Sequence, residues 1–129
     1  MKLLLDTHVL VWSATAPDRL LPEARAALED GTHEALISIV TAWEIAMEAV
    51  AGKARSREAR RAVLPEVLRR TGYEVAELSL SAALRVRGLA WHHRDPFDRL
   101  LIAQALEHGY TLVSRDAAFE AYGVPLIRA

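Results

Sequence analysis

The sequence predicts an α/β fold with a central, mostly parallel sheet of about five strands flanked by helices. Short apolar runs alternate along the chain with stretches that carry apolar residues at helical spacing, the pattern of strand–helix–strand units. The 129 residues are 52% hydrophobic and nearly balanced in charge, so the chain can form one compact domain with a substantial core. We therefore expect a single domain over residues 1–129.

The first half of the chain is predicted to hold two strands and four helices. Its two short, mostly apolar runs are typical of buried strands. Pro22 suits the first turn of a helix, and Gly31 lies just past that helix's expected end. Gly52 and Gly72 follow the next two helices and are expected to end them. In chain order these elements are the strand Lys2–Leu5, the helices Val9–Ala14 and Pro22–Glu29, the strand Ala35–Ile39, and the helices Val40–Val50 and Arg57–Arg70.

The second half is predicted to hold three strands and three helices. A long apolar helix starts at Pro96 and ends at Gly109, again with proline at the start and glycine past the end. The elements around this helix are short. In order they are the strand Tyr73–Leu78, the helix Ser81–Leu89, the Pro96 helix, the strand Thr111–Val113, a short helix near Ala117–Tyr122 and the strand Val124–Ile127.

Composition excludes several classes of protein. The chain has no cysteine, which excludes disulfides, thiol chemistry and thiolate metal sites and fits a cytoplasmic protein. The apolar run at the start looks faintly like a signal sequence, but Asp6 and His8 interrupt it and no small-residue cleavage site follows. No stretch is long enough to span a membrane.

The net charge of −1 gives no overall attraction to nucleic acid, but basic residues crowd one segment. This segment is either a solvated helical face or a basic surface that borders a nucleic-acid groove. Its residues are Lys53, Arg55, Arg57, Arg60, Arg61, Arg69 and Arg70.

The turn before the long helix places two carboxylates at one helix start. Asp95 suits the N-cap, Pro96 the first helical position and Asp98 the third. Capping explains such a turn when it is considered alone. Its place in the fold makes a metal site the competing interpretation.

Four acids are expected at one edge of the sheet, because parallel strands have their carboxyl ends there and ligands usually bind at that edge. Each acid has a structural alternative, three as helix caps and one as a solvated helical residue. A cap contributes about 1 kcal/mol, whereas two carboxylates about 4 Å apart repel by roughly 4 kcal/mol at an effective dielectric near 20. Converging acids would therefore require protonation or a cation, and oxygen donors suit Mg²⁺ or Mn²⁺. The four are Asp6, Glu44, Asp98 and Asp116.

Several motifs in order resemble a PIN domain of the VapC toxin type over nearly the whole chain. They are LLLDTHVLVW, Ser38 with the WEIA segment, Gly52-Lys53, HRDPFDRLLIAQA, and LVSRD followed by Phe119 and Tyr122-Gly123-Val124. The resemblance implies an endoribonuclease that uses Mg²⁺ or Mn²⁺, with one or two ions held by these same four acids. It also implies an RNA substrate, a VapB-like antitoxin as partner and a homodimer.

On this interpretation Asp6 is the central ligand, Asp98 and Asp116 hold the metal directly or through water, and Glu44 completes the shell or orients the attacking water. Supporting residues are expected next to these acids. The hydroxyls could hold a carboxylate or bond within a local turn, and the arginines could meet a phosphate or pair with a carboxylate. The five are Thr7, Ser38, Ser114, Arg99 and Arg115.

The histidines near these acids are kept out of the expected metal shell, without assigned roles: His8, His92 and His93. Three tryptophans could stack on bases. For Trp43, at helical spacing beside apolar neighbours, we expect a core position. Two other functions stay open: a PIN-like module that binds RNA or protein without cutting, and a DNA or flap nuclease.

Overall fold

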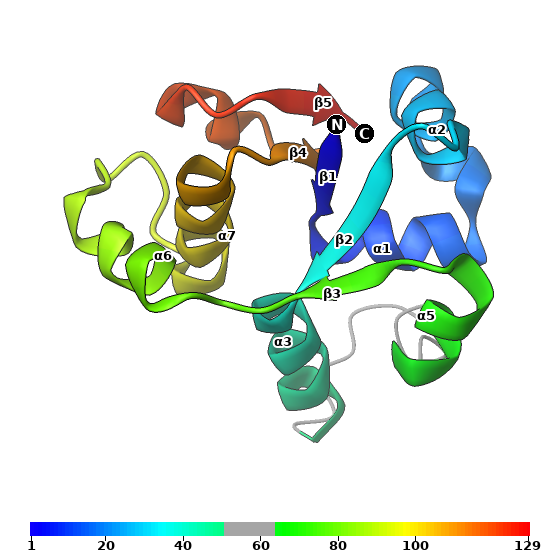
Figure 1. The fold of residues 1–129 in the computed structure, drawn as a ribbon, viewed down its shortest axis with the longest axis horizontal. Coiled ribbons are helices and arrows are strands. Elements are labelled where there is room, and N and C mark those ends of the chain that lie inside the picture. Colours follow the sequence, from blue (N-terminus) through cyan, green and yellow to red (C-terminus); the bar gives the residue numbers. More distant parts are fainter. Residues whose placement is uncertain (51–63) are drawn as a thin grey trace.

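The computed structural model describes residues 1–50 and 64–129, and residues 51–63 are drawn in grey in Figure 1. In the described part of the chain, five parallel strands form one sheet in the order β3-β2-β1-β4-β5. The predicted α/β fold with a parallel sheet is confirmed. The strands are β1 Lys2–Leu5, β2 Glu34–Ser38, β3 Glu74–Ala76, β4 Thr111–Ser114 and β5 Leu126–Arg128.

Helices cover both faces of this sheet (Figure 1). Helices α1, α2 and α5 pack on one face, and α7 packs on the other together with the 3₁₀ helix η3. The helices are α1 Thr7–Thr15, η1 Pro17–Arg19, α2 Pro22–Glu29, α3 Ile39–Val50, α5 Leu64–Thr71, α6 Leu80–Arg85, η2 Val86–Gly88, α7 Pro96–His108 and η3 Ala117–Tyr122.

The central strand β1 supplies side chains to two separate cores. Leu3 and Leu5 contact the core under α1 and α2, whereas Leu4 contacts the core under α7. Alternate residues of a strand point to opposite faces, so a continuous apolar run is needed where both faces are covered. The LLL run of β1 meets this need, and all three leucines are fully buried.

Helix α7 has well-defined ends, and its start lies at the edge of the sheet where β1 and β4 end. The Asp95 side chain accepts from the backbone N–H of Phe97 at 2.8 Å and from that of Asp98 at 3.4 Å. At the other end Gly109 adopts a left-handed conformation with φ of 71°, which glycine adopts without strain. The expected cap at Asp95 and stop at Gly109 are confirmed.

Several predicted boundaries are wrong by a few residues. The α1 helix begins at Thr7 rather than Val9, because Asp6 caps it. The last strand begins at Leu126 rather than Val124, since Pro125 has no N–H to donate to the sheet. The strand expected over Tyr73–Leu78 is shorter, because β3 is an edge strand that pairs only along the end of β2.

The helix expected over Ser81–Leu89 is wrong as one element, since it divides into α6 and the 3₁₀ helix η2. The helix expected over Arg57–Arg70 is described only in its last part, as α5, and its earlier part lies outside the described residues. Within the described ranges, none of the helices combines the length and apolar character needed to cross a bilayer.

Candidate metal and nuclease site

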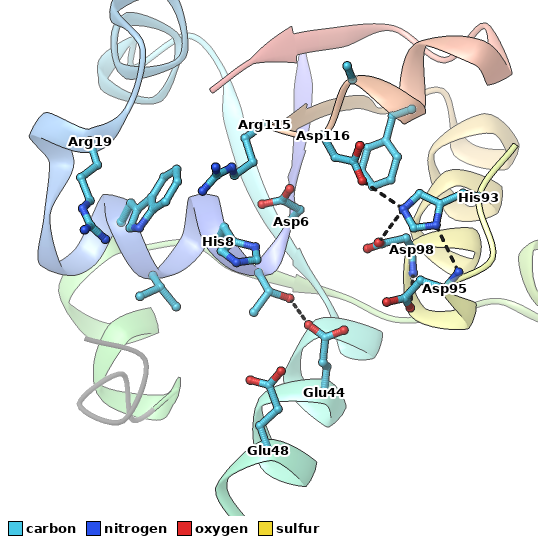
Figure 2. Close-up of a pocket in the computed structure, with 15 residues that line it drawn as sticks. Asp6, His8, Arg19, Glu44, Glu48, His93, Asp95, Asp98, Arg115 and Asp116 are labelled. Atoms are coloured by element: carbon cyan, nitrogen blue, oxygen red, sulfur yellow. Dashed lines mark hydrogen bonds and ion pairs between the residues drawn. The ribbon is translucent and has the colours of Figure 1, made fainter. Parts of the chain in front are cut away.

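The four predicted acids line one cleft with a volume of about 630 Å³. They come from four separate segments: Asp6 follows β1, Glu44 lies on α3, Asp98 lies in the first turn of α7, and Asp116 follows β4. In Figure 2 Asp6 lies in the middle of the cleft, with Asp98 and Asp116 on one side and Glu44 below. The fold thus brings together residues that are far apart in the sequence.

Asp6 is the most deeply buried of these acids, with 6% of its surface exposed. One carboxylate oxygen, Oδ1, accepts from the Val9 N–H at 2.9 Å and caps α1. The other, Oδ2, accepts a short hydrogen bond from the Ser114 hydroxyl. Burial raises the pKa of Asp6, although both hydrogen bonds act in the opposite direction. Asp6 therefore serves as a cap and also presents a desolvated carboxylate to the cleft.

Ser114 connects two of the acids. While its hydroxyl donates to Asp6, its oxygen accepts from the backbone N–H of Asp116 at 3.0 Å. Asp116 also has a double role, because its Oδ1 caps η3 through the Ala118 N–H at 2.9 Å. Burial opposes ionisation of Asp116, but the hydrogen bonds from Ala118 and His93 outweigh it and lower its pKa.

Asp95 and Asp98 have different roles, although both stand at the start of α7. Asp95 makes the cap bonds, whereas the Asp98 carboxylate turns towards His93. Desolvation raises the pKa of Asp98 to about 7, and the nearby Asp95 carboxylate adds to the increase. The ionised Asp98 carboxylate is unfavourable here without a positive charge beside it, and a bound cation would supply that charge.

His93 lies between two acids and is the residue whose position the sequence interpretation missed. Its Nε2 is 3.0 Å from Asp98 Oδ2 and 3.0 Å from Asp116 Oδ2. Its Nδ1 accepts from the backbone N–H of Asp95 at 3.1 Å, so in the neutral ring the proton is on Nε2 and points to the carboxylates. The only signal in the sequence is its place two residues before the Asp95 cap.

Glu44 is held by a hydroxyl from another helix. The Thr7 Oγ1 donates to Glu44 Oε1 at 2.6 Å, which joins α1 to α3. Desolvation raises the pKa of Glu44 despite this bond. Ser38 is different: its buried hydroxyl accepts from the Val40 N–H at 3.0 Å, the local turn bond that was the alternative considered for it.

Arg99 makes no ion pair with a carboxylate of the described residues, which was one of the contacts considered for it from the sequence. Only 3% of its surface is exposed, and the guanidinium donates to backbone carbonyls of the loop that leads to α7 and lies 3.9 Å from the Trp91 ring centroid. Two of its acceptors are the Ala90 oxygen at 2.8 Å and the His93 oxygen at 3.1 Å. Arg99 therefore holds the loop that carries His93.

Arg115 and the tryptophans complete the account of predicted residues. Arg115 is exposed, lines the cleft and lies 5.0 Å from the Trp12 ring centroid. The core position expected for Trp43 is wrong: the side chain lies at the surface, 55% exposed, against the edge of Phe97. Of the other histidines, His8 lines the cleft, whereas His92 packs on Tyr122.

The donor set fits a hard divalent cation. Carboxylate oxygens of Asp98 and Asp116 lie within 4.8 Å of each other, and Asp6 and Glu44 line the same cleft. Carboxylate oxygens are the ligands that Mg²⁺ and Mn²⁺ prefer. Asp6 and Asp116 each use only one oxygen for a helix cap, so capping leaves part of their acceptor capacity for a ligand.

Several known proteins are similar to this chain in sequence or in fold. Ribonuclease VapC22 from Mycobacterium tuberculosis is 28% identical to this chain over 127 residues, which are 95% of this chain and 92% of the relative. The fold resembles solved structures of toxin-antitoxin proteins at low identity. A chain of DNA-bound VapBC from Salmonella typhimurium has a TM-score of 0.69 at 21% identity, over 99% of this chain and 98% of that chain.

A chain of VapBC2 from Rickettsia felis, bound to a DNA fragment from its promoter, has a TM-score of 0.68 at 17% identity. That similarity also covers 99% of this chain and 98% of the other. The family model of the PIN domain matches residues 3–125. Because this match extends over most of the chain, the protein belongs to the PIN domain family.

Proposed function

We propose that this chain is a metal-dependent endoribonuclease and the VapC-like toxin of a toxin-antitoxin pair. The observation that carries the proposal is the convergence of four carboxylates from four segments on one cleft, one of them with its pKa raised to about 7. The similarity to Ribonuclease VapC22 supports RNA as the substrate. In this proposal residues 1–129 act as a single nuclease domain.

The four acids have distinct roles in the proposed site. Asp6, Asp98 and Asp116 hold one or two Mg²⁺ or Mn²⁺ ions, directly or through water, and Glu44 completes the shell or orients the attacking water. When bound, the ion activates water and offsets charge on the phosphate. Thr7 positions Glu44 through the bond seen in the structure, while Ser114 positions Asp6 and Asp116.

The proposed reaction is hydrolysis of a phosphodiester bond. Water attacks phosphorus, the bond from phosphorus to the 3′ oxygen breaks, and a proton goes to that oxygen. The products carry a 5′-phosphate and a 3′-hydroxyl, and the 2′-hydroxyl of RNA takes no part as nucleophile.

The proposed partners follow from the relatives. A VapB-like antitoxin would neutralise the enzyme, which is supported by the similarity of the fold to VapBC structures. A homodimer in the cytoplasm is the form that we propose.

Cleavage of matched oligonucleotides tests the proposed function. The purified chain is expected to cut single-stranded RNA with Mg²⁺ or Mn²⁺, to stop in EDTA, and to leave the DNA version of the same sequence intact. Asp6→Asn should abolish cutting. Preferential DNA cleavage would favour a DNA or flap nuclease, and RNA binding without any cutting would favour a non-catalytic module.

Removing the Ser114 hydroxyl should weaken the metal site without unfolding the protein. In Ser114→Ala, Asp6 loses the short hydrogen bond that the hydroxyl donates to it, and the Asp116 N–H loses its acceptor. Loss of such a supporting partner typically lowers metal affinity about 10- to 100-fold. The measurement is the Mn²⁺ concentration for half-maximal cleavage. Ser13→Ala is the control, because the Ser13 hydroxyl donates to the Leu10 carbonyl within α1. If the two variants required the same Mn²⁺ concentration, the role assigned to Ser114 would be contradicted.

The basic segment from Lys53 to Arg70 is proposed to border the RNA groove. Residues 53–61 of this segment lie outside the described residues, while Arg69 and Arg70 lie on α5, where Arg69 pairs with Glu66. Reversing the charge at Arg55 and Arg57 should weaken RNA binding and make it less dependent on salt, because fewer counterions are released.

Fluorescence anisotropy of a labelled RNA at several salt concentrations measures this effect. The control reverses two arginines on α6 and η2, Arg85 and Arg87, which matches the change in net charge. If the Arg55 and Arg57 variant bound RNA as tightly as the control, the segment would lie outside the RNA footprint.

A further inference from the structure

We propose that Trp12, Arg19 and Arg115 form a subsite that binds a nucleotide of single-stranded RNA next to the scissile phosphate. This inference rests on the proposed function and adds a second, cationic part to the same site. All three residues line the cleft that contains the four acids. In Figure 2 Arg19 and His93 lie on opposite sides of that cleft, and Arg115 lies between Arg19 and the Asp6 carboxylate.

The two arginines are available to a ligand. Both are exposed, and within residues 1–50 and 64–129 neither has a carboxylate within ion-pair distance, whereas Arg25, Arg69, Arg85 and Arg128 each have one. Asp18, the acid next to Arg19, pairs instead with Arg25 at 3.0 Å. Two unpaired guanidiniums in one cleft form a site for an anion, and each can bind a phosphate through two parallel hydrogen bonds.

Trp12 provides a fixed aromatic surface between these charges. The ring is partly buried and packs against the core under α1, so its orientation is set by the fold. The guanidinium carbons of Arg19 and Arg115 lie 5.7 Å and 5.0 Å from its centroid, and the His8 ring centroid lies 5.9 Å away. Aromatic surfaces beside arginines are the arrangement with which proteins bind unpaired bases and the backbone phosphates that join them.

The charge distribution of the cleft favours RNA over an acidic peptide. The carboxylates repel a phosphodiester unless a cation lies among them, so a strand entering this cleft gains from fixed positive charge beyond them. A single strand of RNA would use both ends of the cleft, with its scissile phosphate at the acids and a neighbouring phosphate and base at the subsite. An acidic peptide would use the arginines alone and would be repelled by the acids.

Binding of a labelled single-stranded RNA by the full chain tests the subsite. The measurements use Asp98→Asn as a common background, so that the RNA is not cut during titration. Adding Arg19→Gln and Arg115→Gln should weaken binding at least tenfold, because charge-assisted bonds to phosphate are lost. The slope of log affinity against log salt should fall by about 1.4, the value expected for two phosphate contacts on a single strand.

Two further variants make the test specific. Arg85→Gln is a single-charge control, since that arginine is paired with Glu107 on α7 and does not line the cleft. Trp43→Phe with Trp91→Phe leaves Trp12 as the remaining tryptophan, and RNA should quench its fluorescence through stacking. Both arginines are exposed, so their replacement should leave the unfolding temperature unchanged.

The outcomes separate the subsite from the proposed function. If the wild type cuts RNA but the double arginine variant binds RNA as tightly as the Arg85 control, the subsite is overturned and the nuclease stands. If the wild type fails to cut RNA but the double variant loses RNA affinity, the nuclease is overturned and the subsite stands. Loss of polyglutamate binding with unchanged RNA affinity would overturn the assignment to RNA.

Discussion

Asp98→Asn should abolish RNA cleavage and at the same time stabilise the metal-free protein above pH 7. The loss of activity, at least about a hundredfold, is expected because the variant removes a charged metal ligand from the proposed site. The gain in stability has a separate cause. Desolvation and the Asp95 carboxylate raise the pKa of Asp98 to about 7, so its ionised form is unfavourable in the fold without metal.

The direction of the pH effect follows from proton binding. Between pH 3.8, the ordinary pKa of an aspartate, and about pH 7, the folded chain holds a proton on Asp98 that the unfolded chain has released. The stability contributed by this group is therefore complete below pH 3.8 and is lost as pH rises through 7. Asparagine does not ionise, so the variant's free energy of unfolding should be higher than that of the wild type by roughly 2 to 4 kcal/mol at pH 8. At pH 4 the two proteins should be almost equally stable.

Urea unfolding in EDTA at the two pH values measures this difference. Asp18→Asn is the matched control, because the same chemical change is made at a carboxylate that is 94% exposed. Mn²⁺ should stabilise the wild type at pH 8 but not Asp98→Asn. If Asp98→Asn cut RNA normally, Asp98 would not belong to the proposed site. If the variant and the wild type were equally stable at pH 8, the charge of Asp98 would not destabilise the fold.

Replacing Arg99 should cause the largest loss of stability among the residues around the site. Its buried guanidinium donates to the carbonyl oxygens of Val86, Leu89, Ala90 and His93 and to the Tyr122 hydroxyl oxygen. Arg99→Gln leaves most of these acceptors without a donor, and breaking a buried charged network of this kind typically costs about 3 to 5 kcal/mol.

The measurement is the free energy of unfolding in urea, with Arg87→Gln as the control. Arg87 is an exposed arginine in the neighbouring η2 and should be replaceable at little cost. Arg99→Lys should recover only part of the stability, because one ammonium cannot reach acceptors spread around a planar guanidinium. If Arg99→Gln were as stable as the Arg87 variant, the loop carrying His93 would not depend on this network.

Three of the four acids could be predicted from local patterns in the sequence, whereas Glu44 was identified by its place in the helix after the second strand and by the family resemblance. Asp6 comes directly after an apolar strand, Asp116 lies two residues after another, and the Asp95-Pro96 start identifies the turn that carries Asp98. Parallel strands then bring their ends to one edge whatever the loops do. The structure places these side chains in one cleft, and their catalytic roles stay proposals.

The position of His93 could not be predicted in this way, since it depends on the loop between α6 and α7. That loop is held by the buried Arg99 and by Tyr122, whose hydroxyl accepts from the His93 N–H at 2.8 Å. The contacts join residues in three segments, and no spacing rule connects them. The surface position of Trp43 was missed for a related reason: helical spacing indicates one apolar face but not whether a neighbour covers it.

Binding of Mn²⁺ to the purified chain at pH 8, followed by electron paramagnetic resonance without RNA, tests the central claim most directly. We predict that the wild type binds one or two ions, and that the variant with Asp6, Asp98 and Asp116 changed to Asn and Glu44 to Gln binds none at the same concentrations. Equal binding by the two proteins, or no binding by the wild type, would contradict a metal centre built by these four acids.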